Sequence, residues 1–286
     1  MAPCAARVYR VGMGQVRLLA ILAHPDDESL GFGGTLAKYA AEGVEVSLIT
    51  ATRGEAGRFH GHRPGEPEHP GASALGAIRA QELLDAGRAL GIREVRLLDY
   101  RDAELDRANP YEATATLAHH VRDLRPDVVV TFGPDGAYGH PDHVAISQLA
   151  SASVVAAASP HLSGQALPPH AASKLYYLAW PSAKWSAYEA AFRKLTVTVD
   201  QQERQATPWP DWAITTRVDT RAQWPTVWRA VQCHQSQIAA YERLQDLPQA
   251  HHEALWGQQS FYRAFSTVNG GRTAETDLFD GLRVTS

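Results

Sequence analysis

Residues 22–34 read Leu-Ala-His-Pro-Asp-Asp-Glu-Ser-Leu-Gly-Phe-Gly-Gly and follow directly on an apolar run that begins at Val16. An apolar run bounded by turn residues is typical of a buried strand. Its end carries four ionisable side chains: His24, Asp26, Asp27 and Glu28. Three neighbouring carboxylates repel one another and lose hydration on burial. Because a divalent cation would remove that penalty, the stretch predicts a metal site at a strand end.

Strands and helices alternate from this stretch to about residue 157. The expected strands are 16–23, 44–50, 95–98 and 127–132, and the expected helices are 33–41, 74–90, 111–124 and 141–157. This alternation predicts an α/β fold with a Rossmann-like, mostly parallel sheet covered by helices on both faces. Active sites in such sheets lie beyond the carboxyl ends of the strands. Residues 24–28, 50–55 and 133–143 are therefore expected at one edge, although the strand order stays open.

The composition changes after residue 158, and all seven tryptophans lie at or beyond Trp180. Strands are expected at 174–179, 195–199 and 261–268, and a long helix at 220–244. Thr220 and Gln223 have the spacing of a capping box at the start of that helix. No linker-like composition marks a boundary. We expect a single domain over residues 1–286, with a core at about 15–157 and a C-terminal α+β elaboration at about 158–286 that shapes the substrate pocket.

Charge and cysteine content restrict the class of protein. The formal net charge is −4 and there is no long basic run, so no nucleic-acid partner is expected. Cys4 and Cys233 give no disulfide framework, which favours a reducing, cytoplasmic location. Residues 1–15 lack the apolar core of a signal peptide. No stretch approaches the roughly 20 apolar residues of a membrane span, so no membrane partner is expected either. Self-association as a homo-oligomer stays open.

A second informative stretch, residues 136–143, reads Gly-Ala-Tyr-Gly-His-Pro-Asp-His. Pro141 is suited to the first position of a helix, where its missing N–H is not needed. His140 and His143 then lie in the first turn and can point toward the same edge as His24 and Asp27. Two imidazoles and a carboxylate with an open position suit catalytic zinc. The same ligand set also describes the facial triad of non-haem iron enzymes.

The two stretches together resemble the PIG-L/LmbE-like zinc-dependent N-deacetylases. The resemblance rests on Ala-His-Pro-Asp-Asp-Glu at 23–28 and His-Pro-Asp-His at 140–143, and it covers residues 15–155. His-Gln-Ser-Gln at 234–237 resembles the C-terminal His-x-Ser-Gln element of that family. The resemblance implies a metal-dependent amidohydrolase that removes the N-acetyl group from an N-acetylglucosamine-containing small molecule. Some members act on inositol or malate conjugates of N-acetylglucosamine. If this protein shares one of those substrates, it takes part in low-molecular-weight thiol biosynthesis.

The resemblance also implies a metal centre and a base. His24, Asp27 and His143 correspond to the Zn²⁺ ligands, and Fe²⁺ accepts the same ligand set. Asp26 corresponds to the general base. An amide carbonyl is a weak electrophile and water is a weak nucleophile, and a bound metal assists both. Because Asp26 neighbours a ligand in sequence, its carboxylate can reach the attacking water.

Three further residues are expected to act around the scissile bond. By resemblance, His140 stabilises the oxyanion or protonates the leaving amine, and the sequence leaves open whether Asp26 or His140 supplies that proton. Tyr138 corresponds to a tyrosine over the scissile carbonyl, with simple packing as the alternative. Asp142 corresponds to a carboxylate that orients a histidine, a common task beside metal ligands.

Substrate-binding roles follow from the resemblance alone. They fall on Arg53, Glu55, Arg79 and His234. For Arg79 the alternative is an ion pair with Glu82 on the same helix face. For His234 the alternative is a core or capping role.

Other polar residues favour structural interpretations. Glu28 is expected to be structural. His60, His62 and His69 lie in a Gly- and Pro-rich segment, 53–73, that predicts a loop and possible lid rather than a second metal site. The glycines of residues 31–34 do not predict a dinucleotide site, because carboxylates stand where a pyrophosphate would bind.

Two other functions compete with the deacetylase. One is a non-haem iron facial-triad enzyme, in which Asp26 would have no evident task. The other is a non-catalytic metal- or glycan-binding protein. The group attached to the amino sugar cannot be derived from these residues.

Overall fold

The computed structural model describes residues 15–162, 166–192, 196–199, 202–205, 207–271 and 273–283. The expectations for residues 1–14 with Cys4, and for Leu195, lie outside the described residues. Across the described parts of the chain, no helix is both long enough and apolar enough to cross a membrane.

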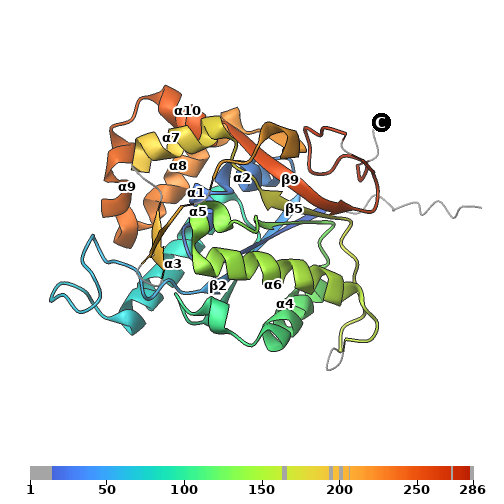
Figure 1. The fold of residues 1–286 in the computed structure, drawn as a ribbon, viewed down its shortest axis with the longest axis horizontal. Coiled ribbons are helices and arrows are strands. Elements are labelled where there is room, and N and C mark those ends of the chain that lie inside the picture. The colour runs from blue at the N-terminus through green and yellow to red at the C-terminus, as the bar shows by residue number, and fades with distance from the viewer. Residues whose placement is uncertain are drawn as a thin grey trace, which may run out of the picture.

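A seven-stranded sheet forms the centre of the molecule (Figure 1). Its strands are β1 (Arg17–Leu22), β2 (Glu45–Thr52), β3 (Glu94–Tyr100), β4 (Val128–Phe132), β5 (Lys174–Leu178), β8 (Thr216–Asp219) and β9 (Gln258–Ser266). The spatial order is β3-β2-β1-β4-β5-β9-β8, in which the first five strands are parallel and β9 is antiparallel to both neighbours. The predicted Rossmann-like α/β sheet is therefore confirmed, and strands from beyond residue 158 extend it. A separate two-stranded sheet pairs β6 (Val197–Val199) with β7 (Gln202–Arg204).

Helices flank the sheet and gather at one end of it. The α-helices are α1 (Asp27–Leu30), α2 (Gly33–Ala41), α3 (Ala72–Leu90), α4 (Pro110–Leu124), α5 (Gly136–Gly139), α6 (Pro141–Ala158), α7 (Ser182–Phe192), α8 (Trp224–Cys233), α9 (Ile238–Gln245) and α10 (Gln249–Trp256). The short 3₁₀ helices are η1 (Leu105–Arg107), η2 (Asp211–Ala213), η3 (Arg221–Gln223) and η4 (Gln235–Gln237). Helices α4 and α6 pack on each other, as do α2, α3 and α8. Helices α7 to α10 cluster at the upper left of Figure 1.

Local sequence explains where several helices begin and end. Asn109 caps α4, because its side chain accepts hydrogen bonds from the N–H groups of Tyr111 and Glu112. Pro110 occupies the first turn, as proline prefers. Helix α3 ends at Gly91, which has φ 78° and thus the left-handed conformation that glycine adopts most easily.

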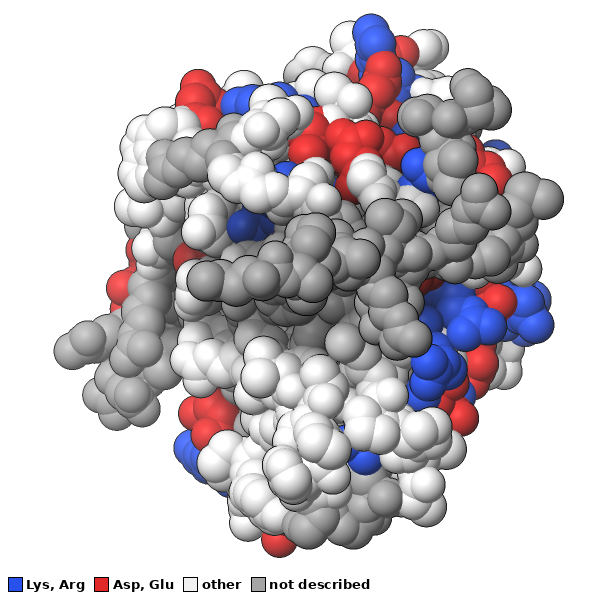
Figure 2. Space-filling view, turned by 90° about the vertical axis from the view of Figure 1, so that its right-hand side faces the viewer, with Lys and Arg blue, Asp and Glu red and all other residues white. Residues whose placement is uncertain are grey.

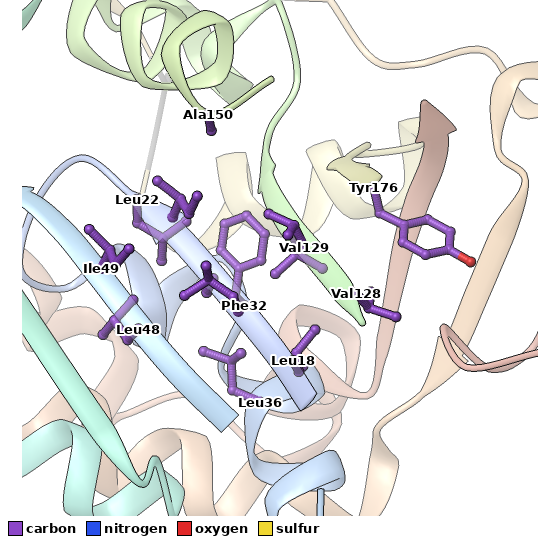
Figure 3. Close-up of a cluster of buried hydrophobic side chains, with 14 of the residues drawn as sticks. Leu18, Leu22, Phe32, Leu36, Leu48, Ile49, Val128, Val129, Ala150 and Tyr176 are labelled. Atoms are coloured by element: carbon purple, nitrogen blue, oxygen red, sulfur yellow. The ribbon is translucent and has the colours of Figure 1, made fainter. Parts of the chain in front are cut away.

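The core lies between the central strands and the helices around them (Figure 3). Leu18 and Leu22 of β1, Val129 of β4 and Phe32 are at most 1% exposed. Burying a side chain of this kind stabilises a fold by about 1.5–3 kcal/mol. The near-continuous apolar character of β1 and β4 follows from burial on both faces of the sheet.

The predicted bounds of two elements were wrong. The predicted helix at 220–244 is divided into η3, α8, η4 and α9, with a break at His234 (φ −81°, ψ 61°). The predicted capping box does not form, because the Thr220 hydroxyl donates to the carbonyl of Trp256 instead. Strand β9 begins at Gln258, three residues earlier than predicted, because its first residues pair with β8.

The surface carries charges of both signs. On the face shown in Figure 2, acidic and basic side chains of the described residues lie in mixed groups. This mixture agrees with the formal net charge of −4.

Candidate active site

The carboxyl ends of β1, β3 and β4 meet at one edge of the sheet, where parallel α/β sheets place their sites. His24 and Asp27 follow β1, Asp102 follows β3, and His143 lies in the first turn of α6 after β4. The sequence predicts His24, Asp27 and His143 at this edge.

The side chains of His24, Asp27 and His143 lie close together, with both oxygens of Asp27 near the two imidazoles. His24 Nδ1 lies 3.2 Å from His143 Nε2, His143 Nε2 lies 3.2 Å from Asp27 Oδ1, and His24 Nδ1 lies 3.6 Å from Asp27 Oδ2. Ligand atoms held tetrahedrally at zinc distances lie about 3.4 Å from one another. All three side chains are at least nine-tenths buried. Their donor types, spacing and burial therefore fit a zinc-sized cation.

Two carboxylates contact Nε2 of His24, the ring nitrogen that faces away from Asp27 and His143. His24 Nε2 lies 3.1 Å from Asp102 Oδ1 and 3.1 Å from Asp142 Oδ2. Burial would raise the pKa of Asp102, but the hydrogen bond and charge of His24 lower it to about 2. Asp142 also accepts hydrogen bonds from the N–H groups of Ala103 and Leu105. These contacts orient the His24 ring so that Nδ1 faces the other two metal-binding side chains, as second carboxylates commonly do.

Asp102 is not among the site residues predicted from the sequence. The predicted strand at 95–98 stops short of it, whereas β3 extends to Tyr100. A signal was available, because Asp102 lies two residues beyond a parallel strand and hence at the edge where sites form. Its backbone N–H donates to Glu55 Oε1, and its carboxylate accepts from the Ala56 N–H.

Asp26 lies in an unusual backbone conformation, with φ 105° and ψ −24°. A positive φ at a residue other than glycine costs about 1–3 kcal/mol and persists only where the surroundings enforce it. The Asp26 N–H donates to Glu28 Oε2 at 2.9 Å, and Asp26 Oδ2 accepts from Arg79 Nη2 at 3.1 Å. The side chain of Asp26 keeps 17% of its surface exposed, toward two cavities.

Arg79 is 5% exposed and joins three segments. Its guanidinium donates to the carbonyls of Gly54 and Pro25 and to the carboxylate of Asp26. Gly54 has φ 66°, and a Cβ there would overlap the Arg79 guanidinium. Glu82, the alternative partner of Arg79, accepts two hydrogen bonds from Ser236. Arg79 lines one cavity and also positions Asp26.

His140 and Tyr138 line the same cavity as Asp26 and Arg79. His140 caps α6, with Nδ1 accepting from the Asp142 N–H at 3.2 Å. Burial, together with the nearby His24 and His143 rings, lowers the pKa of His140 to about 3. A neutral His140 with Nδ1 as acceptor carries its proton on Nε2. The Tyr138 ring centroid lies 5.2 Å from that of His143, and burial raises the pKa of the Tyr138 phenol.

Two cavities meet at Asp26, Asp27 and Tyr138. One holds about 240 Å³ and has polar walls that include Arg79 and His140. The other holds about 220 Å³ and is lined mainly by apolar and aromatic groups. A substrate whose bond to be cleaved lies beside Asp26 can therefore extend to both sides.

The sequence of this chain is similar to those of known deacetylases. A model of the PIG-L family, described as GlcNAc-PI de-N-acetylase, matches residues 19–154. A 1D-myo-inositol 2-acetamido-2-deoxy-alpha-D-glucopyranoside deacetylase of Kineococcus radiotolerans is 34% identical over 311 residues, which cover 94% of this chain and 84% of that protein. The chain belongs to the PIG-L deacetylase family.

Two further matches agree. The protein of the same name from Thermobifida fusca is 36% identical, and the match covers 79% of this chain and 85% of that protein. A conserved protein of Thermus thermophilus has a solved structure that is 25% identical, with a TM-score of 0.63 and coverage of 90% of this chain and 98% of that one. The sequence-based identification of the family is confirmed, and with it the enzyme class.

Three residues expected to bind substrate in this deacetylase lie away from both cavities. Arg53 donates to Asp99 at the surface, and Glu55 accepts from the Asp102 N–H. His234 is fully buried and donates to Glu28 at 2.8 Å. In the structure, Glu55 thus supports the loop around Asp102, His234 supports Glu28, and Arg53 pairs with Asp99. A substrate contact by any of the three stays a prediction.

The His-Gln-Ser-Gln element still serves the deacetylase site. Ser236 donates to Glu82 through both its N–H and its hydroxyl, at 2.6 and 2.7 Å. Gln237 donates to the carbonyl of Arg58 at 2.7 Å and lines the polar cavity, a position that sequence reasoning missed. The carbonyl of Ser236 accepts from the His60 N–H. The element therefore holds Arg58 and His60 of the loop between β2 and α3, and Gln237 lies in the wall of the polar cavity.

The histidines of that loop do not converge. His62 lies near Glu66 and Glu68 at 3.5 and 3.6 Å, whereas His69 contacts the carbonyl of Gly57. Within the part of the chain that the structure describes, two groups of side chains have the close spacing of metal ligands: His24 with His140 and His143, and His24 with Asp102 and Asp142.

Proposed function

We propose that this deacetylase is a zinc-dependent enzyme that removes the N-acetyl group from an N-acetylglucosamine conjugate. The inositol conjugate named for its curated relatives is the first candidate substrate. The observation that carries the proposal is the position of Asp26 between two cavities and directly beside His24, Asp27 and His143.

Zinc would be held by His24, Asp27 and His143, whose atoms have suitable types and spacing. When bound there, it would polarise the amide carbonyl and lower the pKa of a water molecule. Fe²⁺ accepts the same ligands. Asp102 and Asp142 would keep the His24 ring in place from its far side.

Asp26 is the proposed general base. Its carboxylate faces both cavities and is held by Arg79, which fixes one of its oxygens. The carboxylate takes the proton of the attacking water as the new carbon–oxygen bond forms. That proton is then available to the amine nitrogen as the carbon–nitrogen bond breaks, which gives acetic acid and a neutral amine. The acid then gives up its own proton to the amine, so the final products are acetate and a protonated amine.

His140 and Tyr138 are the proposed donors to the developing oxyanion. Neutral His140 offers its Nε2 proton, because Nδ1 accepts from the Asp142 N–H. The raised pKa of Tyr138 keeps its phenol protonated and able to donate. Donors that are fixed before reaction stabilise the charge that develops in the transition state.

The polar cavity is the proposed place of the amino sugar. Arg79, Asp102, His140 and Gln237 line it, and hydroxyl groups removed from water need such partners. A role in low-molecular-weight thiol biosynthesis follows if the inositol conjugate is the substrate. A cytoplasmic location and self-association remain predictions.

The test is acetate release from a panel of N-acetylglucosamine conjugates that includes the inositol conjugate. The protein is stripped of metal with a chelator and then reloaded with one equivalent of zinc. We expect release only from reloaded protein and the highest kcat/KM for one conjugate. Turnover that needs oxygen and iron would instead favour the facial-triad alternative. Tight binding of intact conjugates without acetate release would favour a non-catalytic binding protein.

A further inference from the structure

The apolar cavity beside Asp26 is larger than an acetyl group requires. It holds about 220 Å³ of space for water-sized groups. A single water molecule, which is close to a methyl group in size, occupies about 10–15 Å³ as a sphere. The methyl group of an acetyl substituent would therefore leave most of the cavity unfilled.

The walls of this cavity suit a hydrocarbon chain. They include Leu30, Phe132, Trp180 and Tyr188. The rings of Trp180 and Tyr188 stack with centroids 4.2 Å apart and planes at 18°, which makes one flat aromatic wall. The Tyr188 hydroxyl donates to the carbonyl of Leu30, so its polar end is already satisfied. Each methylene group of a ligand that is buried against such walls increases its binding affinity by about fourfold.

The chemistry of the two cavities decides which part of the substrate enters each. The hydroxyl-bearing sugar requires polar partners, which the cavity lined by Arg79, Asp102 and Gln237 provides. Both cavities include Asp26 and Tyr138 in their walls, so the amide to be cleaved lies where they meet. The acyl part of the amide then points into the apolar cavity.

We propose that this enzyme also hydrolyses N-acyl amino sugars whose acyl chains are longer than acetyl, from propionyl to about hexanoyl. The inference rests on the proposed function, and it extends the substrate class of the same site. The reaction has the same balance as deacetylation: the carbon–nitrogen bond breaks, water supplies the new carbon–oxygen bond, and the products are a short-chain carboxylate and the protonated amine.

The first experiment compares zinc-loaded enzyme on N-acetyl-, N-propionyl-, N-butyryl- and N-hexanoyl-glucosamine, with the free amine as the measured product. We expect kcat/KM for the butyryl compound to be at least one tenth of that for the acetyl compound. In the variant Leu30→Trp, the larger side chain narrows the cavity. It should lower the ratio of kcat/KM for the butyryl compound to that for the acetyl compound at least tenfold.

Two further variants support the comparison. Leu84→Trp makes the same substitution at a leucine that is 41% exposed on α3, and it should leave all four rates unchanged. Trp180→Leu opens the aromatic wall and should shift the preference toward the hexanoyl compound. It tests the cavity independently if Leu30→Trp fails to fold.

Binding provides a second readout that does not depend on turnover. In an Asp26→Asn background, calorimetry should show at least tenfold tighter binding of N-hexanoyl-glucosamine than of N-acetyl-glucosamine, and Leu30→Trp should remove that gain. Acetyl-only turnover without a binding gain would overturn the inference and leave deacetylation intact. Equal losses for all acyl groups in Leu30→Trp would place the sugar in this cavity and also overturn it. A binding gain without turnover of any compound would contradict the proposed function, and with it the hydrolysis of longer acyl chains.

Discussion

His234 donates to Glu28 at 2.8 Å, and both side chains are fully buried. The other oxygen of Glu28 accepts from the N–H of Asp26. A histidine of the C-terminal part is thus linked, through one carboxylate, to the backbone of the proposed base. Because Asp26 has a positive φ, this link helps to enforce a conformation that the residue would not adopt alone.

The His234–Glu28 pair predicts a pH-dependent contribution to stability. Burial alone would lower the pKa of His234, but the charge and hydrogen bond of Glu28 raise it above its usual value. A raised folded-state pKa gives stabilisation that is complete below the unfolded pKa of about 6.5 and is lost as the pH rises through the folded pKa. The difference in unfolding free energy between wild type and His234→Phe should therefore be larger at pH 6 than at pH 9, as measured by urea denaturation.

His252 provides the control for that experiment. It is 5% exposed among Trp224, Trp228 and Trp256, and burial lowers its pKa. A lowered histidine pKa destabilises the fold as the pH falls below about 6.5. His252→Phe should therefore show the opposite trend, with a smaller difference from wild type at pH 5 than at pH 8. A pH-independent difference for His234→Phe would show that the pair with Glu28 carries no charge.

A substitution at Gly54 should disturb Arg79. In Gly54→Ala, the new Cβ would overlap the guanidinium of Arg79, and the residue would also be held at φ 66°. We expect kcat to fall at least tenfold and stability to fall by more than the cost of a positive φ alone. Gly43→Ala is the matched control, because Gly43 has φ 81° with no atom within 4 Å of the added Cβ. It should lose about 1 kcal/mol and keep full activity.

Arg79 should act on catalysis through its geometry as well as its charge. Arg79→Lys keeps a positive charge but cannot reproduce the guanidinium fork that reaches Gly54, Pro25 and Asp26 together. We expect kcat to fall by about 10²-fold, in the range that general-base catalysis contributes, while zinc content stays at one equivalent. Arg88→Lys, on the same helix with its side chain 68% exposed, should be silent. Wild-type kcat in Arg79→Lys would limit Arg79 to a structural role.

Asp142 should govern metal affinity. Its carboxylate holds His24 Nε2 at 3.1 Å and accepts from two backbone N–H groups. Loss of such a partner typically lowers metal affinity by about 10–100-fold. Competition with a chromophoric chelator should show that loss for Asp142→Asn. The same substitution at Asp211, whose side chain is 85% exposed, should bind zinc as wild type does. Equal zinc affinities of the two variants would show that Asp142 does not contribute to metal binding.

The sheet and the proposed metal ligands could be predicted because their signals are local. The apolar run before His24 and the proline before Asp142 mark a strand end and a helix start within a few residues. The break at His234 could not be predicted in this way. Its partner Glu28 lies 206 residues away, and residues 220–244 alone have a helical pattern.

The substrate-binding residues were harder to predict for a related reason. Arg79 and Glu55 have side chains that can reach either a ligand or a neighbouring backbone, and only the packed structure shows which groups lie near them. The position of Asp102 after a parallel strand was a usable signal, but its contact with His24 depends on the order of the strands, which periodicity does not encode.

The central claim is that Asp26 is the base of a zinc-dependent deacetylase, and one measurement tests it most directly. Acetate release from the inositol conjugate is compared for wild type and Asp26→Asn, each loaded with one equivalent of zinc. Asp26→Asn keeps the shape of the side chain but cannot accept the proton of water. We predict zinc-dependent release by wild type and a loss of about 10²–10⁴-fold in kcat for the variant. Full turnover by Asp26→Asn at equal zinc content would contradict the account.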